Sequence, residues 1–366
     1  MTRPVGVGVI GCGNISTAYL TAARTFPILD IVALADARPE AARARAAEFG
    51  LRAVSVEDLL ADPDVEIVLN LTVPRAHVEV DLAALAAGKH VYSEKPLGVS
   101  LVEGRRLAAA AGAKGLRLGC APDTFLGGAH QAARALIDDG AIGRPVGGSA
   151  FFMCPGHERW HPDPGFYYLA GGGPMLDMGP YYITDLVNLL GPVASVSGVA
   201  TRSRSERPIL SEPLKGQIIP VEVATHVSGV LEFVSGAAVA ITMSFDVAKH
   251  KHVPLEIYGE GGTLIVPDPN YFGGKIEVAA PGEDWREAPL RHAYHDGNYR
   301  SLGLADMAQA IRSGRPHRAS GALALHVLEV MEAFQISYDR GAKVEIVTRP
   351  ERPAPLPSTL SVGQLD

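Results

Sequence analysis

The sequence predicts an α/β fold followed by an α+β fold, because the pattern of strands and helices changes near residue 146 of a 366-residue chain. Before that point, short apolar runs alternate with helix-like segments, which indicates a doubly wound parallel sheet. Beyond it the alternation with helices stops, and several runs alternate apolar with polar residues. That pattern is typical of a large, mostly antiparallel sheet that has one open face and helices on the other.

The chain is longer than a single hydrophobic core usually supports, so two domains are expected. We predict a first domain over residues 1–122, a second over 123–345 and a tail over 346–366. The tail is expected to be irregular because it contains prolines 350, 353, 355 and 357. It is either an arm that lies on a neighbouring molecule or a loose end.

Composition narrows the class of protein. Apolar residues make up 47% and charged residues 20%, which is the ordinary globular range. The net charge of −7 argues against a nucleic-acid surface, and no apolar run reaches the roughly 18 residues that span a bilayer. The first residues lack the basic head and apolar core of a secretory signal. Cys12, Cys120 and Cys154 show no CxxC spacing, so we expect reduced thiols and a cytoplasmic protein.

The first predicted strand, Val5 to Ile10, enters a glycine turn that opens a helix-like segment. The turn reads Gly11-Cys12-Gly13-Asn14-Ile15-Ser16, and a second apolar run ends at Asp36. Glycines allow a tight turn and close approach to a pyrophosphate, which the amides of the helix start would bind. An acidic residue about 20 positions further on is placed for a ribose hydroxyl. This is the dinucleotide fingerprint of a Rossmann domain, with Gly11, Gly13, Asn14 and Ile15 as cofactor-binding residues.

Asp36 and Arg38 bear on the choice between NAD and NADP. The carboxylate of Asp36 repels the 2′-phosphate of NADP, whereas a guanidinium at Arg38 pairs with such a phosphate. NAD is therefore expected, and NADP stays an alternative.

The alternation then continues through helix 39–49, strand 65–71, helix 76–87, strand 89–93, helix 101–113 and strand 116–120. Ligands of a doubly wound sheet bind at the carboxyl ends of its strands. Those ends carry Thr72 and Pro74, Glu94 and Lys95, and Asp123. His77 follows the turn at Pro74 and either faces the cofactor or is a loop histidine satisfied by its neighbours.

Among these strand ends, Glu94-Lys95-Pro96 is the most specific indication of function. A Glu-Lys-Pro sequence by itself is generally a surface turn. Here it follows a strand of the predicted nucleotide-binding sheet, and proline restricts the turn after Lys95. We therefore predict that Lys95 lies where a nicotinamide ring would bind.

A second polar constellation follows the glycines 171–173. On a helix, Asp177 and Tyr181 share one face because they are four residues apart. Pro180 complicates this arrangement, since the helix must either bend there or begin near Gly179. Tyr182 is accordingly an alternative to Tyr181. The structural alternative for the whole segment is a loop followed by an amphipathic helix with a solvated polar face.

The second domain is expected to contain an antiparallel sheet and an aromatic segment. Predicted strands cover 146–153, 194–202, 221–233, 237–247, 253–258, 262–266 and 275–279. Trp160, His161 and Tyr167 lie in a segment whose ring faces and polar tips suit a sugar, and His161 is the predicted substrate contact. A hydrophobic plug between the domains is the alternative. Histidine pairs at 250/252 and 292/295 lack nearby carboxylates or thiols at zinc-site spacing, so no metal is expected.

These segments together resemble the Gfo/Idh/MocA family of sugar and polyol oxidoreductases. The resemblance rests on GCGNIS at 11–16, NLTVPRAH at 70–77, AGKHVYSEKPLG at 87–98, GGGPMLDMGPYYITDL at 171–186 and ALALHVLEVMEAFQIS at 322–337. It implies a catalytic lysine at Lys95, an aspartate at Asp177 and an acid/base residue at Tyr181. It also implies a homodimer or homotetramer, because the family uses the open sheet face to oligomerise.

The chain departs from the commonest family pattern at two places. Position 181 is a tyrosine where many members have a histidine, as in the glucose–fructose oxidoreductase and dihydrodiol dehydrogenase branches. The segment after the strand at 116–120 reads GCAPDTF in place of G-x-N-x-R-F. Asp123 then stands where a positive contact is common, which suits a neutral, hydroxyl-rich substrate.

The activity expected from the resemblance is hydride transfer between nicotinamide and a secondary carbinol or ketone of a sugar or cyclic polyol. The carbinol proton needs an acceptor, and a free phenol, with a pKa of about 10, is a poor one at neutral pH. An ammonium at Lys95 would favour the phenolate of Tyr181, and Asp177 would orient the hydroxyl. Lys95 itself is an alternative base. The competing functions are a non-redox glycosidase that retains NAD and a protein that senses NAD.

Overall fold

The computed structural model describes residues 3–366, and the chain divides into two compact units. Unit 1 is formed by the chain up to Gln131, by Arg291–Leu325 and by Pro353–Asp366. Unit 2 is formed by Ala132–Leu290 and His326–Arg352. Each unit therefore contains segments that are far apart in the sequence.

Unit 1 is built on a five-stranded parallel sheet in the order β2-β1-β3-β4-β5. The strands are β1 (Val5–Ile10), β2 (Leu29–Ala35), β3 (Ile67–Asn70), β4 (His90–Ser93) and β5 (Leu118–Cys120). All residues of β1, β3 and β5 are buried, as expected when helices cover both faces of a parallel sheet. The order reverses beside β1, which is the place where doubly wound sheets bind ligands.

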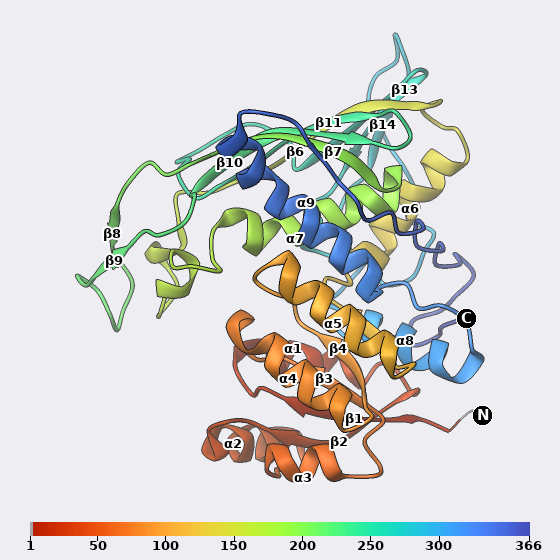
Figure 1. The fold of residues 1–366 in the computed structure, drawn as a ribbon. Coiled ribbons are helices and arrows are strands. Elements are labelled where there is room, and N and C mark those ends of the chain that lie inside the picture. The colour runs from red at the N-terminus through yellow and green to blue at the C-terminus, as the bar shows by residue number, and fades with distance from the viewer. Residues whose placement is uncertain (1–2) are drawn as a thin grey trace. The chain divides into compact units, whose positions relative to one another are not determined.

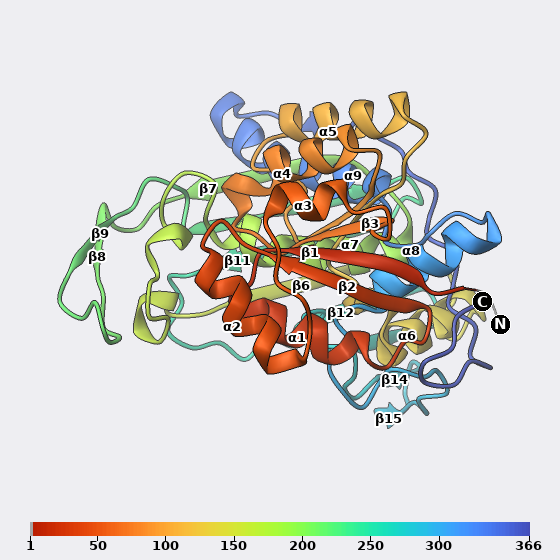
Figure 2. The same cartoon turned by 90° about the horizontal axis from the view of Figure 1, so that it is seen from below.

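Helices cover this sheet on both faces, with α3, α4 and α5 on one face and α1 on the other (Figure 2). They are α1 (Asn14–Ala23), α2 (Pro39–Phe49), α3 (Val56–Ala61), α4 (Pro74–Ala86) and α5 (Leu101–Ala113). The alternation predicted from the sequence is confirmed. The short α3 was not predicted; it begins at Ser55, whose side chain accepts a hydrogen bond from the amide of Asp58.

Later parts of the chain complete unit 1. After η1 (Thr124–Leu126) and the start of α6 (Gly128–Asp138), the chain returns with α8 (Leu302–Ser313) and the first turn of α9 (Gly321–Arg340). Before α9, the carbonyl of Ala319 accepts the amide of Cys120 at 3.1 Å, and Ser320 bridges to Gly119. The edge of β5 is thus covered.

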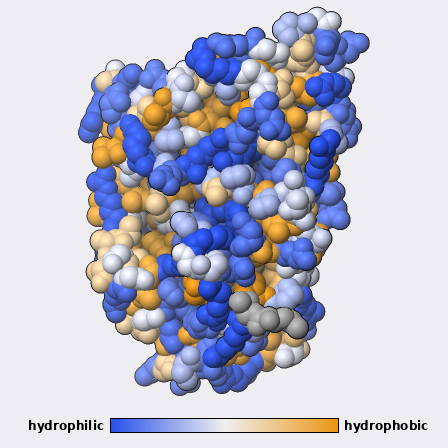
Figure 3. All heavy atoms as spheres, turned by 90° about the vertical axis from the view of Figure 1, so that its right-hand side faces the viewer, coloured by the Kyte–Doolittle hydropathy of each residue, from blue (hydrophilic) through white to orange (hydrophobic). Residues whose placement is uncertain are grey.

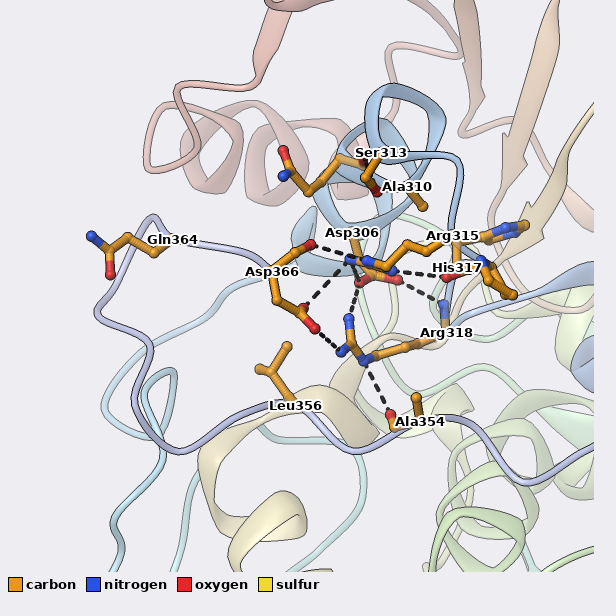
Figure 4. A network of polar contacts seen from close by, with 12 residues as sticks. Asp306, Ala310, Ser313, Arg315, His317, Arg318, Ala354, Leu356, Gln364 and Asp366 are labelled. Atoms are coloured by element: carbon orange, nitrogen blue, oxygen red, sulfur yellow. Dashed lines mark hydrogen bonds and ion pairs between the residues drawn. The ribbon is translucent and has the colours of Figure 1, made fainter. Parts of the chain in front are cut away.

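The tail is held by its own chain rather than loose. The side chain of Arg318, only 3% exposed, donates to the carbonyls of Ala354 and Pro355 and to the carboxylate of Asp366 (Figure 4). Tyr294 donates to the carbonyl of Gln364 at 2.6 Å. Residues 353–366 therefore form an irregular but fixed strap on unit 1, which we call the C-terminal strap.

Unit 2 contains a nine-stranded sheet in the order β15-β14-β13-β12-β6-β11-β10-β7-β16, in which only the pair β6–β11 is parallel. The predicted strands appear as β6 (Pro145–Met153), β7 (Val193–Thr201), β10 (His226–Phe233), β11 (Ala238–Ser244), β12 (Leu255–Gly259), β13 (Gly262–Val266) and β14 (Glu277–Ala279). The short β15 (Arg286–Glu287), β16 (Val344–Glu345) and the separate hairpin of β8 (Glu206–Pro208) and β9 (Ile218–Pro220) were not predicted.

One face of this sheet is covered by α7 (Pro174–Leu190) and α9, which run along it in Figure 1. A side chain at Gly198 would meet the ring of Phe334 on α9 at 2.5 Å, so the helix packs directly on the strand. Val199 of β7 and Val230 of β10 are 48% and 40% exposed, so part of the sheet is open to solvent. The predicted α/β plus α+β fold class is confirmed.

No helix in residues 3–366 is both long and apolar enough to cross a membrane. On the face drawn in Figure 3, hydrophilic residues are spread widely among smaller apolar areas.

Candidate active site

The glycine turn after β1 needs a residue without a side chain at Gly11. Gly11 has a φ of +104°, and a Cβ there would lie 2.5 Å from the carbonyl carbon of Leu71. Gly13 is the N-cap of α1, and a Cβ at Gly13 would meet nothing within 4 Å. Because the N-cap residue is a glycine, it offers no side chain to bond the first amides of α1. The turn thus leaves open space beside a helix amino end, which fits the pyrophosphate of a dinucleotide.

Asp36 follows β2 and is tied to the glycine turn. Its Oδ2 accepts the amide of Cys12 at 2.8 Å, and its Oδ1 accepts the amide of Arg38 at 2.9 Å. The side chain of Arg38 is 72% exposed, and its Nε lies 3.9 Å from Oδ1 of Asp36. Burial and the charge of Asp36 raise the pKa of Cys12 to about 11, so this thiol stays protonated.

His77 connects the turns after β3 and β4. Its Nδ1 lies 2.8 Å from the carbonyl of Pro96 and its Nε2 lies 3.0 Å from the carbonyl of Thr72. The ring is fully buried, and burial lowers the pKa of His77. Both ring nitrogens thus lie beside carbonyl oxygens, and a neutral imidazole can donate to one of them. The choice between the two alternatives for His77 stays open, and a direct cofactor contact from His77, Thr72 or Pro74 stays a prediction.

Lys95 lies in a turn whose backbone is fixed by a buried carboxylate. Glu94, 8% exposed, accepts the hydroxyl of Tyr19 at 2.7 Å through Oε1 and the amide of Lys95 at 2.8 Å through Oε2. The peptide bond between Lys95 and Pro96 is cis. Lys95 itself is half-buried. Since Tyr19 belongs to α1, the turn of Lys95 and the helix of the fingerprint are held together.

Asp123 is used inside unit 1. Its Oδ2 accepts the amides of Ser301 and Gly303 at 3.1 and 2.9 Å, at the start of α8, and the residue is 1% exposed. Burial raises the pKa of Asp123 to about 6. This carboxylate binds the amide groups of the α8 start, and a substrate contact by Asp123 stays a prediction.

In unit 2 the predicted glycine segment leads into α7. Gly173, with a φ of +95°, ends the loop, and Pro174 occupies the first turn of the helix. Pro180 lies inside α7, which runs on to Leu190. Of the two alternatives for this segment, a helix start near Gly179 is wrong: α7 runs through Pro180, and Asp177 lies in its first turn.

The two tyrosines of α7 differ in their surroundings. Tyr181 is 7% exposed and Tyr182 1% exposed. The hydroxyl of Tyr182 donates to Asp268 at 3.2 Å, and burial raises the pKa of Tyr182 well above its usual value. Tyr182 is therefore committed to a structural contact, which leaves Tyr181 as the better candidate of the two.

His157 is the residue that the sequence reasoning missed. It lies in η2 (His157–Arg159), after β6, and its Nε2 is 3.2 Å from Oδ2 of Asp177. Trp160 donates to its Nδ1 at 3.1 Å, and the ring packs against Tyr167 and Phe245. No sequence pattern pairs His157 with a carboxylate 20 residues later, because that contact depends on tertiary packing.

His161, the predicted substrate contact, is half-buried beside this group. Its Nδ1 accepts the amide of Asp163 at 3.1 Å, and burial lowers the pKa of His161. Trp160 and Phe166 expose 61% and 48% of their surface nearby. Aromatic faces of this kind can stack on the C–H surface of a sugar.

Two family models match this chain, one in its first third and the other in the part that follows. Residues 5–121 match the model of the oxidoreductase family with an NAD-binding Rossmann fold, and residues 130–265 match that of the GFO/IDH/MocA C-terminal domain. A 1,5-anhydro-D-fructose reductase of Ensifer adhaerens is 35% identical over 47% of this chain and 52% of its own length. The match thus spans about half of that relative.

A levoglucosan dehydrogenase of Pseudarthrobacter phenanthrenivorans is 26% identical over 71% of this chain and 73% of its own length. A solved structure of a levoglucosan dehydrogenase with NADH covers 94% of this chain and all of that one, with a TM-score of 0.83 and 22% identity. This structural likeness shows a shared fold.

Proposed function

The chain belongs to the Gfo/Idh/MocA family of oxidoreductases and has its NAD-binding Rossmann domain, and we propose that it transfers a hydride between NAD and a secondary carbinol or ketone of a sugar or cyclic polyol. The relatives named above are a reductase of 1,5-anhydro-D-fructose and a dehydrogenase of levoglucosan, which supports a sugar substrate. The observation that carries the proposal is the fixed turn of Lys95, held by Glu94 and Tyr19 at a strand end of that domain.

The reaction needs a proton acceptor and a cation near the carbinol oxygen, and the bound nicotinamide supplies the hydride chemistry. We assign the cation to Lys95, which is half-buried and whose backbone cannot move freely. Tyr181 takes the hydroxyl proton in this proposal, and Asp177 orients the hydroxyl. Lys95 stays the alternative proton acceptor.

NAD is the proposed cofactor in preference to NADP. Both oxygens of Asp36 accept backbone amides of the adjoining turns, so the carboxylate is held at the end of β2. A fixed negative charge there repels a 2′-phosphate. The exposed Arg38 keeps NADP possible at a lower efficiency.

Further features support a neutral, hydroxyl-rich substrate and a homo-oligomer. His161 and the exposed ring of Trp160 suit sugar hydroxyls and C–H faces, and we keep Asp123 as a proposed contact.

The exposed Val199 and Val230 on the open sheet face suit contact with a second copy of the chain, as a dimer or tetramer. The three cysteines are free, which suits a reducing cytoplasm.

Initial rates of NADH formation with inositols, hexoses and anhydro-sugars test the proposal. Lys95→Ala is expected to lower turnover at least about a hundredfold, as for the loss of a group that stabilises charge in the transition state, with little change in NAD affinity measured by calorimetry. Lys114→Ala is the matched control, since this exposed lysine of unit 1 uses its ammonium to donate to the carbonyl of Ala86. Wild-type turnover in the Lys95 variant would refute the role of Lys95, and no turnover of any such substrate by the natural protein would refute the function.

A further inference from the structure

Two hydrogen bonds join three side chains of unit 2: Trp160, His157 and Asp177. The indole Nε1 of Trp160 lies 3.1 Å from Nδ1 of His157, and Nε2 of His157 lies 3.2 Å from Oδ2 of Asp177. The side chains of His157 and Asp177 are 10% and 18% exposed. The ring of His157 is thus enclosed while the carboxylate keeps an accessible part.

The direction of this chain follows from the chemistry of its groups. An indole N–H can donate but cannot accept, so Nδ1 of His157 must be the acceptor. A neutral imidazole then carries its hydrogen on Nε2, which donates to the carboxylate of Asp177. Trp160 therefore selects one tautomer of His157.

The backbone of His157 is fixed by a buried ion pair. Its amide donates to the hydroxyl of Tyr168 at 3.0 Å, and that hydroxyl donates to Oε2 of Glu158. Arg207, from the β8–β9 hairpin, donates to Oε1 of Glu158 at 2.8 Å and to the carbonyl of Phe245 at 3.0 Å. Because Glu158 and Arg207 are 3% and 2% exposed, the turn that carries His157 is bound firmly from both sides.

The ring is also fixed by packing. Its centroid lies 4.4 Å from that of Tyr167 and 4.5 Å from that of Phe245. Such contacts restrict rotation of the imidazole, so its Nε2 stays directed at Asp177. The backbone hydrogen bond, the ring contacts and the bond to Nδ1 together hold the side chain of His157 in one orientation.

We propose that His157 is a positioning residue for the carboxylate of Asp177, locked by Trp160 as the Nε2–H donor. This inference rests on the proposed function, in which Asp177 orients the substrate hydroxyl. By binding one oxygen of Asp177, His157 fixes the plane of the carboxylate and thereby the direction of its other oxygen. The imidazole that donates to Asp177 belongs to His157, in the segment after β6. Position 181, four residues after Asp177 on α7, is a tyrosine.

Two substitutions of His157 separate donation from mere space filling. His157→Gln keeps an N–H donor near the position of Nε2, whereas His157→Asn is too short to reach Asp177. We expect His157→Asn to lower kcat about tenfold to a hundredfold, the range for a hydrogen bond to a charged group, with KM for NAD unchanged. His157→Gln should recover most of that loss. His250→Gln, an exposed position of unit 2, is the control and should match the natural protein.

Equal losses in the Gln and Asn variants would overturn the proposal, because donation would then not matter. A second measurement needs no turnover: ¹⁵N spectra of labelled histidine side chains, with His157→Gln for assignment. We expect the neutral Nε2–H tautomer in the natural protein and a mixture of tautomers in Trp160→Phe. An Nδ1–H tautomer in the natural protein would overturn the proposal. Absence of sugar turnover combined with the expected tautomer would instead count against the proposed function alone.

Discussion

Asp81 of α4 is a carboxyl buried behind the ends of β3 and β4. Its Oδ1 accepts the side-chain amide of Asn70 at 2.7 Å, while its Oδ2 and the hydroxyl of Ser93 are buried with no hydrogen-bond partner in the described residues. Burial raises the pKa of Asp81 from 3.8 to about 7. Because the folded-state pKa is raised, the native state loses stability as pH rises from about 4 to about 7. The full penalty is on the order of 4 kcal/mol.

Asp81→Asn should therefore stabilise the protein at pH 8. Asparagine keeps an oxygen for Asn70, offers a donor to Ser93 and carries no charge to bury. We expect the free energy of unfolding to rise by about 1–4 kcal/mol at pH 8, with most of the gain lost near pH 3, where aspartate is mostly protonated in both states. Thermal unfolding at the two pH values measures this, and a variant less stable than the natural protein at pH 8 would contradict it.

At the scale of residues, the sequence located groups that follow strands and missed groups placed by packing. Lys95 and Asp36 were predictable because the ends of parallel strands bind ligands, and the structure places both there. His157 was not, since its contact with Asp177 joins a loop to a helix. Asp123 was assigned to a substrate from its place after a strand and from the departure from the family pattern there, and its bonds to the start of α8 have no signal in the sequence.

The C-terminal strap is an element without regular secondary structure that is nevertheless firmly bound. Arg318 is buried and pairs with Asp306, which is fully buried, and with Asp366 at the end of the chain (Figure 4). Arg315 also pairs with Asp306 at 2.7 Å. The same guanidinium of Arg318 that holds the strap thus neutralises a buried carboxylate of α8.

Arg318→Ala and Asp366→Asn are expected to differ widely in their effect on stability. The first leaves Asp306 with one cation fewer and frees two strap carbonyls, so unfolding should become easier by about 3–5 kcal/mol. The second removes two ion pairs, with Arg315 and Arg318, in which Asp366 is partly exposed, which should cost about 1 kcal/mol. Calorimetric melting temperatures compare the two, and equal shifts would show that Arg318 does not anchor the strap.

At the scale of elements, a strand could be predicted where it lies in an apolar run or in an alternating pattern longer than the strand itself. The three-residue strands β5 and β14 were found within the predicted runs 116–120 and 275–279. Strands β8, β9, β15 and β16 have two or three residues each, and no such run includes them. The β8–β9 hairpin was therefore missed, although its Arg207 fixes the turn that carries His157.

For the whole molecule, the division into units is less simple than one boundary in the sequence. Unit 1 takes α8 and the C-terminal strap from the far end of the chain. A run of alternating strands and helices cannot reveal that its last strand is covered by residues some 200 positions later, as Cys120 is by Ala319. The dinucleotide fingerprint, by contrast, is local, and it predicted the cofactor domain correctly.

A fragment that ends at Gln131 should consequently fail to fold cooperatively. It lacks α8, the residues that cover the edge of β5 and the strap, so an unpaired strand edge and apolar surface would be exposed. We expect aggregation and no sharp melting transition, whereas the full chain melts sharply. A soluble fragment that melts cooperatively and binds NAD would contradict this prediction.

The central proposal is that Lys95 and Asp177 serve one reaction, and a double-mutant cycle tests it most directly. With the best sugar substrate, kcat/KM is measured for the natural protein, Lys95→Ala, Asp177→Asn and the double variant. If both groups stabilise one transition state, the double variant loses little more than the worse single variant, because effects of cooperating groups are not additive. Losses that multiply across the cycle, or a single variant with natural activity, would contradict the account.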